Sequence, residues 1–244
     1  AAGVDAFIGA ASSGVSFTVI DKITGANVIQ FSGANTSPDF TEYDDNGLYF
    51  RTAPSDVLQG RVLSDLIVAD GNATVGIMAR QDPYGEGLLQ YTAEPLVEAG
   101  AEVVNDGGIV YDPAAENFDA EVGEIVAADP DAFVMIGFEE SAQVLTSLFE
   151  AGYTQGDKNI YLVDGNVGNA LGENFTDPGI LEGIRGTLPS AEVSDEFKDR
   201  LLEVDPALED FSYGPEVYDA MIITALAAEV AGTEGGARWR RPDR

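Results

Sequence analysis

Residues 4–38 read VDAFIGAASSGVSFTVIDKITGANVIQFSGANTSP, and this stretch determines the expected fold. A short apolar strand (4–9) is followed by a turn of small residues (10–14), an amphipathic helix (15–23) and a second strand (28–31). Loops this short between a strand, a helix and a strand predict a right-handed βαβ unit with two parallel strands.

Two small polar turns follow the carboxyl ends of these strands. Ligands of open parallel sheets bind outside those ends. Ser12 and Ser13 open the helix, where free backbone N–H groups and the helix dipole favour an anion, and residues 34–37 add hydroxyls and backbone groups. The pattern suggests a carboxylate held between the two turns. The alternative is that Ser12 or Ser13 only caps the helix.

Composition narrows the function classes. The chain has 244 residues, of which 45% are hydrophobic, enough for one large domain or two lobes. Its net charge is −31, which repels nucleic acid and anionic membranes. It has no cysteine or histidine, which excludes disulfides, thiol nucleophiles and Cys/His zinc sites. Extreme acidity is typical of proteins from salt-accumulating halophiles, where salt screens self-repulsion, and we expect a halophilic protein.

Strands and helices alternate through the middle of the chain, which is typical of doubly wound α/β proteins. The helix that starts at Ser55 has a predicted apolar face made of Val57, Leu58, Val62, Leu66 and Ile67. Residues 232–244 are basic (+2) and are expected to be a disordered or non-native tail. The predicted strands are 48–51, 74–79, 102–110, 132–137, 160–163 and 183–188, and the predicted helices 55–69, 85–99, 117–128, 140–151, 169–175, 195–204 and 213–231.

Enzymatic motifs are missing. No phosphate-binding loop, no dinucleotide fingerprint and no nucleophile elbow is present, and no histidine could complete a catalytic triad. Residues 44–47 (DDNG) faintly resemble a calcium loop, but the later ligand positions do not follow, so a turn is expected. We therefore expect no enzyme, no cofactor and no metal site. A hydrolase that works through two carboxylates stays open as a low-ranked alternative.

The order and spacing of several motifs resemble the substrate-binding component of branched-chain amino acid (Liv-type) ABC transporters. These motifs are AFIGAASSG, FSGANTSP followed by LYFRTAPSD, TVGIMA followed by QDPYGEG, VDGNVGN and YGPEVYDA. The resemblance spans residues 2–231 and implies a type I periplasmic-binding-protein fold. That fold has two doubly wound parallel-sheet lobes with a hinge and an interlobe cleft.

The resemblance also implies where the lobes lie. Lobe one is expected to comprise residues 1–54 and 189–231, and lobe two residues 55–188. The family's first strands would precede Ala1 and its closing strands would follow residue 231. We therefore expect an N- and C-terminally truncated fragment with an incomplete lobe one.

Six ligand-binding residues follow from the resemblance, three in each lobe. In lobe one, Ser13 and Thr36 would hold a ligand carboxylate, and the Ala34 carbonyl would face the ligand's ammonium group. From the sequence alone, Ser13 could instead be a cap of its helix.

In lobe two, Asp164 of VDGNVGN would neutralise the ammonium, and Tyr84 and Phe138 would cover the ligand. Without the resemblance, Asp164 could be a turn residue, Tyr84 could pack at a helix start, and Phe138 would more often belong to a core.

The resemblance implies an extracytoplasmic solute-binding protein, at the cell surface or in the periplasm. It would be a monomer that binds a branched-chain or related amino acid and presents it to a membrane permease. A lipid anchor upstream of Ala1 is compatible with this location. The alternative is a ligand-sensing domain of the same fold, as in receptors and amide sensors.

Overall fold

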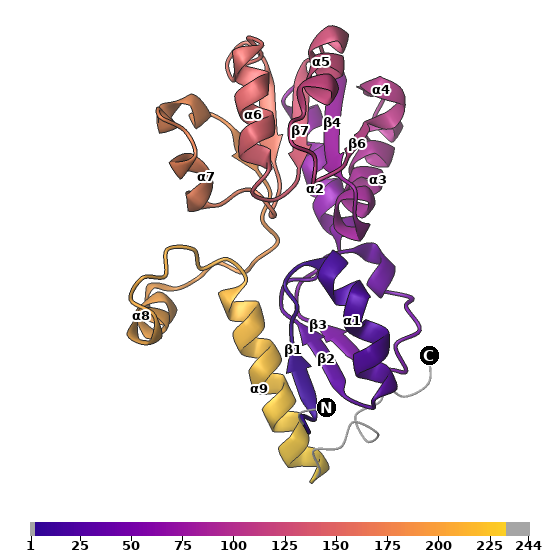
Figure 1. Ribbon diagram of the computed structural model, residues 1–244, viewed down its shortest axis with the longest axis vertical. Coiled ribbons are helices and arrows are strands. Elements are labelled where there is room, and N and C mark those ends of the chain that lie inside the picture. The colour runs from indigo at the N-terminus through magenta and orange to yellow at the C-terminus, as the bar shows by residue number, and fades with distance from the viewer. Residues whose placement is uncertain (1–2, 233–244) are drawn as a thin grey trace. The chain divides into compact units, whose positions relative to one another are not determined.

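The computed structural model describes residues 3–232 and divides the chain into two compact units (Figure 1). Unit 1 combines the residues up to Ser55 with those from Ser190 onward, and unit 2 is Asp56–Pro189. The expected tail, residues 232–244, lies outside the described residues except for Gly232.

Unit 1 is built on a parallel sheet in the order β1–β2–β3. Its strands are β1 (Ala6–Ile8), β2 (Ile29–Ser32) and β3 (Tyr49–Arg51), its helices α1 (Ser13–Gly25), α8 (Asp195–Val204) and α9 (Gly214–Ala231), and a short 3₁₀ turn, η1, spans Pro38–Phe40. Helix α1 joins β1 to β2, so the predicted parallel βαβ unit is confirmed. Both polar turns therefore lie at the carboxyl edge of this sheet.

Two apolar clusters hold the unit 1 sheet. One cluster joins Ile29, Phe31 and Leu48 to Ala220 of α9. The approach of α9 is close: a Cβ atom on Gly33 would lie 2.5 Å from the Val217 Cγ2 atom, so a larger residue does not fit there. The other cluster stacks aromatic rings beside Ile20 of α1, including Phe40 and Tyr49 at a centroid distance of 4.5 Å.

Unit 2 contains a six-stranded parallel sheet in the order β5–β4–β7–β8–β9, with β6 also paired to β4. The strands are β4 (Thr74–Arg80), β5 (Glu102–Val103), β6 (Ile109–Tyr111), β7 (Ala132–Ile136), β8 (Asn159–Leu162) and β9 (Arg185–Gly186). The helices are α2 (Asp56–Ala69), α3 (Pro83–Glu98), α4 (Val104–Gly107), α5 (Asp119–Ala128), α6 (Ser141–Glu150) and α7 (Asn169–Glu173), with a 3₁₀ turn, η2, at Pro178–Leu181.

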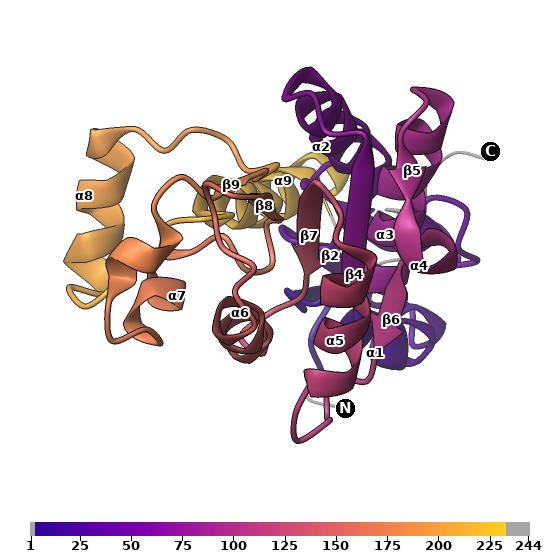
Figure 2. The same ribbon diagram turned by 90° about the horizontal axis from the view of Figure 1, so that it is seen from above.

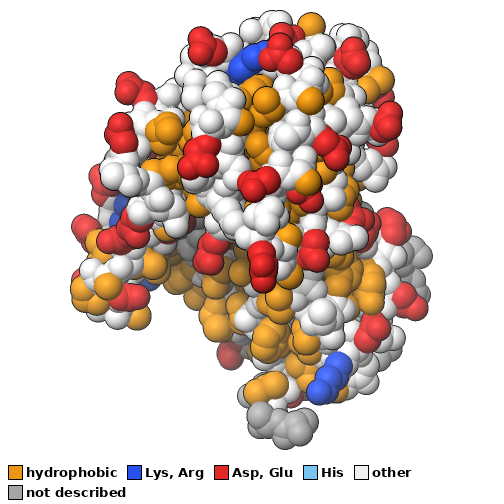
Figure 3. Space-filling model, turned by 45° about the horizontal axis from the view of Figure 1, so that its top comes forward, with side chains coloured by type: hydrophobic (Ala, Val, Ile, Leu, Met, Phe, Trp, Pro, Cys, Tyr) orange, Lys and Arg blue, Asp and Glu red, His pale blue; other side chains and the backbone are white. Residues whose placement is uncertain are grey.

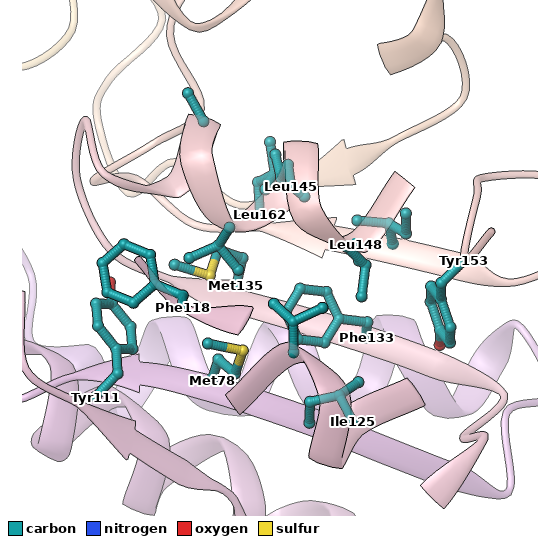
Figure 4. Packing of buried hydrophobic residues seen from close by; sticks show 14 of the residues in the cluster. Met78, Tyr111, Phe118, Ile125, Phe133, Met135, Leu145, Leu148, Tyr153 and Leu162 are labelled. Atoms are coloured by element: carbon teal, nitrogen blue, oxygen red, sulfur yellow. The ribbon is translucent and has the colours of Figure 1, made fainter. Parts of the chain in front are cut away.

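Both faces of this sheet are covered by helices. Side chains alternate between the faces of a strand, and in β4 Ile77 packs in one cluster while Met78 packs in the other. The Ile77 cluster includes residues of α2 and α3. The Met78 cluster includes Phe133 of β7 and Leu145 of α6 (Figure 4). Figure 2 shows α2 and α6 on opposite sides of β4 and β7. This three-layer α/β arrangement confirms the predicted fold class.

Two local predictions were wrong. The single strand expected at 102–110 is divided into β5 and β6 by α4, where Asn105 (φ 57°) and Asp106 (φ 54°) are left-handed. Asn and Asp tolerate that conformation better than other non-glycine residues. The strand expected at 183–188 is reduced to Arg185–Gly186.

The predicted apolar face of α2 was wrong in part. Val57, Leu58 and Val62 are exposed, whereas Ile67 is buried and Leu66 packs, partly buried, against the same cluster. The helix instead packs on α3 through small residues: a Cβ atom on Gly60 would lie 2.4 Å from the Tyr91 carbonyl oxygen. The close contact between the two helices therefore decides which face of α2 is buried.

Candidate ligand-binding site

The two polar turns of unit 1 contact each other through Ser13. This residue opens α1 and is 2% exposed. Its Oγ accepts a hydrogen bond from the backbone N–H of Ser37 at 3.2 Å, and Thr36, beside it, is 1% exposed. The structure therefore brings Ser13 to the turn that contains Ala34 and Thr36. We call these three residues the first half-site.

Ser12 and Ser13 have different roles at the start of α1. Ser12 is the N-cap, and its Oγ accepts from the Val15 N–H at 3.5 Å. The capping alternative thus describes Ser12, whereas the Ser13 side chain serves the neighbouring turn. The first N–H groups of a helix have no acceptor within it, so this end of α1 carries partial positive charge.

Side chains that sequence reasoning missed hold the two turns in place. The buried Asn35 amide donates to the carbonyl oxygens of Ala10 (3.1 Å) and Ala11 (2.8 Å), and its Oδ1 accepts from the Tyr49 hydroxyl at 3.0 Å. Arg51 Nη1 donates to the carbonyls of Asn35 and Ser37, at 3.2 and 2.8 Å. These bonds give the first half-site a fixed backbone.

In unit 2, the structure brings Tyr84, Phe138 and Asp164 into one group, which we call the second half-site. The Tyr84 hydroxyl donates to Asp164 Oδ1 at 2.6 Å and accepts from the Gly165 N–H at 3.1 Å. The rings of Tyr84 and Phe138 stack, with centroids 5.2 Å apart and planes 7° apart. Tyr84 is buried, whereas Phe138 and Asp164 are half-buried.

The turn before α3 positions Tyr84. Asp82 is the N-cap, and its Oδ1 accepts from the N–H groups of Tyr84 (3.0 Å) and Gly85 (2.8 Å). Gly165 leaves room for the Tyr84 hydroxyl, because a Cβ atom there would lie 2.8 Å from that oxygen. The DPYGEG and VDGN motifs therefore fit together through one tyrosine.

An ion-pair network supports Phe138. Arg80 pairs with Glu140 (2.6 Å) and Asp82 (2.8 Å), and its guanidinium carbon lies 4.0 Å from the centre of the Phe138 ring. Glu140 Oε1 also accepts from the Phe138 N–H and from the Tyr111 hydroxyl. Burial, with the Glu140 charge second, raises the pKa of Tyr111 far above its usual value of 10, so Tyr111 remains a neutral donor.

Gln59 of α2 is a further neighbour of Asp164 that sequence reasoning missed. Its Nε2 lies 3.0 Å from Asp164 Oδ1, with the Thr187 Oγ1 and carbonyl oxygen also within reach. The two residues are 105 positions apart in the chain. No local pattern could have connected them.

Acidic side chains are common on the surface of the protein. Asp and Glu side chains are spread over the face in Figure 3, with few Lys or Arg between them. No group of three or more acidic residues within 3–232 is arranged to hold a metal ion. Over the same residues, no helix is long and apolar enough to cross a membrane.

Comparison with known protein families decides the classification. The family described as "Receptor family ligand binding region" matches residues 1–241. The chain belongs to this family. The resemblance seen in the sequence motifs is therefore confirmed at the level of family and fold.

Individual members of the wider group include binding proteins and receptors. The chain is 26% identical to Leu/Ile/Val-binding protein homolog 1 of Brucella abortus, over 95% of this chain and 61% of that protein. It is 24% identical to glutamate receptor 2.4 of Arabidopsis thaliana, over 84% of this chain and 23% of that protein. The chain spans between 23% and 61% of the length of these relatives.

Among solved structures, a leucine-binding protein from Thermotoga maritima superimposes with a TM-score of 0.83. The match has 20% sequence identity and covers 97% of this chain and 67% of the other. At this identity, the likeness shows the fold. The matched proteins carry the names of binding proteins and receptors.

Proposed function

We propose that this chain is an extracytoplasmic solute-binding protein that binds a branched-chain or related amino acid and delivers it to the permease of an ABC importer. The observation that carries the proposal is the chemistry of the two half-sites. One offers hydroxyls, backbone N–H groups and a helix start, and the other offers a single carboxylate among aromatic rings.

This chemistry suits an α-amino acid, because such a ligand carries a carboxylate and an ammonium group close together. Buried charges are tolerable only when they are paired and hydrogen-bonded. Ser13 and Thr36, with the N–H groups of the α1 start, would hold the carboxylate. Asp164 would pair with the ammonium, and the Ala34 carbonyl would accept from it.

The aromatic residues of the second half-site would contact the apolar part of the ligand. The Phe138 ring is half-buried and is held by Tyr84 and Arg80. The Tyr84 hydroxyl already donates to Asp164, so Tyr84 would also orient the carboxylate. In this proposal, units 1 and 2 are the two lobes, and both half-sites bind the same ligand molecule.

The proposed setting follows from the family and the charge. Names among the matched proteins refer to amino acid binding, which supports an extracytoplasmic location and a permease as partner. We propose a monomer without cofactor, metal or nucleic acid. The net charge of −31 supports a halophilic source, in which salt screens the acidic surface.

Calorimetric titration tests the proposal. The 244-residue chain is titrated with leucine, isoleucine and valine, and then with 4-methylpentanoate and isopentylamine. These last two compounds lack the ammonium group and the carboxylate of leucine, respectively. We expect at least one amino acid to bind more tightly than both analogues. Absence of binding for all three amino acids, or equal affinity for the analogues, would overturn the proposal.

A second candidate is a ligand-sensing domain of the same fold. The family description and the match to a plant glutamate receptor favour it. The neighbouring genes separate the two candidates. Permease and ATPase genes beside this gene would support transport, whereas a membrane helix or kinase encoded downstream in the same polypeptide would support sensing.

A further inference from the structure

Gln59 is a buried glutamine at the centre of a hydrogen-bond group in unit 2. Its side chain is 3% exposed. Its Nε2 lies 3.0 Å from Asp164 Oδ1, 3.1 Å from Thr187 Oγ1 and 3.3 Å from the Thr187 carbonyl oxygen. Three segments that are distant in sequence, namely α2, the loop after β8 and the residues after β9, therefore meet at this one amide.

The hydrogen-bond partners fix the orientation of this amide. A carboxylate oxygen and a carbonyl oxygen only accept hydrogen bonds, so the atom that faces Asp164 and Thr187 has to be the NH₂ group. One N–H reaches Asp164, and the two Thr187 oxygens share the other. The opposite atom, Oε1, is buried and has no hydrogen-bond partner among the described residues.

The unpaired Oε1 atom indicates that packing alone does not explain a glutamine at this position. A buried acceptor without a partner costs stability, and an aliphatic side chain of similar size would avoid that cost. What glutamine provides here, and leucine could not, is the N–H donated to Asp164. The geometry therefore favours a role for Gln59 at the carboxylate over a role in packing.

We propose that Gln59 is a positioning residue that orients Asp164 toward the ammonium group of the ligand; the inference rests on the proposed function. Gln59 and Tyr84 donate to the same oxygen, Oδ1, from two different helices, at 3.0 and 2.6 Å. Two donors from separate directions fix the plane of the carboxylate before the ligand arrives. Pre-organisation of this kind improves affinity because less is lost in ordering the site on binding.

Thr187 fixes Gln59 in turn. The Thr187 N–H donates to the Leu162 carbonyl at 3.2 Å, which extends the pairing of β9 with β8. The second N–H of Gln59 is therefore held by a residue that is itself anchored to the sheet. This contact restricts the rotation of the amide, so the Asp164 bond has a fixed direction.

The test compares Gln59→Leu with Ser64→Ala, a matched control on the same helix. Ser64 is buried and its Oγ bonds the carbonyls of Gly60 and Thr92, so its loss perturbs α2 without touching Asp164. Affinities for leucine and 4-methylpentanoate are measured by calorimetry for each variant. We expect Gln59→Leu to weaken leucine binding about ten-fold, as for loss of a hydrogen bond to a charged group, and to leave 4-methylpentanoate binding unchanged.

The control variant should keep the leucine preference of the unaltered chain. If Gln59→Leu weakens the binding of leucine and of 4-methylpentanoate equally, Gln59 acts only on the structure of the site. That result would overturn this inference but leave the proposed function standing. If the unaltered chain binds no amino acid, the proposed function fails and the inference fails with it.

Gln59→Glu keeps the inference testable if the leucine variant does not fold. At neutral pH, two carboxylates would face each other, and Asp164 would lose one of its donors. At about pH 5, the introduced carboxyl group begins to be protonated and can again donate. We expect leucine affinity in this variant to recover by several-fold from about pH 7.5 to about pH 5 relative to the unaltered chain. No difference between the two pH profiles would contradict the inference.

Discussion

Tyr84→Phe is the substitution that most directly probes the second half-site. It removes one oxygen atom and keeps the ring that stacks on Phe138. That oxygen donates to Asp164 Oδ1 at 2.6 Å and accepts from the Gly165 N–H at 3.1 Å. Tyr84 is 2% exposed, so water cannot readily replace either bond.

The expected cost follows from these two bonds. A hydrogen bond to a charged group contributes about 1.5–3 kcal/mol, and leaving a buried donor without a partner costs about 1–3 kcal/mol. Because the two effects share one atom, they do not add fully. We expect Tyr84→Phe to lower the free energy of unfolding by about 2–4 kcal/mol and to weaken leucine binding, since Asp164 loses one of its donors.

Urea unfolding, monitored by circular dichroism, measures the change in the free energy of unfolding. Tyr91→Phe is the matched control, because Tyr91 lies on the same helix and no hydrogen bond of its hydroxyl is found among the described residues. We expect the control to change the free energy of unfolding by less than about 0.5 kcal/mol. A double-mutant cycle with Asp164→Asn isolates the contribution of the pair.

The result that would refute this reasoning is a loss in Tyr84→Phe no larger than in the control. The hydroxyl would then not hold Asp164 in solution. A coupling energy near zero in the cycle would lead to the same conclusion, even if each single variant were less stable.

Three further predictions concern other parts of the chain. Thr36→Val should weaken amino acid binding by about 1–3 kcal/mol, because a ligand carboxylate oxygen loses its donor; unchanged affinity by calorimetry would remove Thr36 from the site. Gly33→Ala should destabilise unit 1 by about 1–3 kcal/mol, because the added Cβ atom would lie 2.5 Å from the Val217 Cγ2 atom. Thermal melts measure this loss. The control Gly123→Ala adds a Cβ atom in open space on α5 and should be neutral or stabilising in the same melts. Hydrogen bonds from backbone N–H groups hold the pKa of the Asp131 carboxyl below its usual value. The stabilisation that Asp131 provides is therefore present above about pH 4 and is lost as the pH falls through the folded-state pKa. Asp131→Asn should remove this part of the pH dependence of unfolding, and an unchanged pH dependence would contradict the prediction.

The fold was largely predictable because its signals are local. Apolar runs, short loops and helix caps mark the βα units, and α8 begins and ends at the predicted residues, after the Ser194 N-cap. The order of the motifs then identified the family. Apolar runs, short loops and helix caps each involve residues that are close together in the chain, so they can be recognised from the sequence.

Errors arose where tertiary contacts override local pattern. The apolar residues Val57 and Leu58 were expected to share a buried face, but Gly60 and Ser64 lie against α3 instead. Small residues give little signal in a hydrophobicity pattern. The left-handed residues of α4 likewise interrupt a run that is otherwise typical of a strand.

The same contrast between local signals and long-range contacts holds for the candidate site. The hydroxyls of Ser13 and Thr36 could be located because they lie in polar turns at strand ends. The supports of the site could not, since Arg51 and Gln59 act across long sequence separations. Sequence patterns therefore located residues that could touch a ligand, but not those that orient them.

The central claim is that both half-sites bind one amino acid, and a leucine titration followed by ¹⁵N nuclear magnetic resonance tests it most directly. We predict amide shift changes at Ser13 and Thr36 in unit 1 and at Tyr84 and Gly165 in unit 2, all with the same midpoint concentration. Changes confined to one unit, or different midpoints in the two units, would contradict the claim.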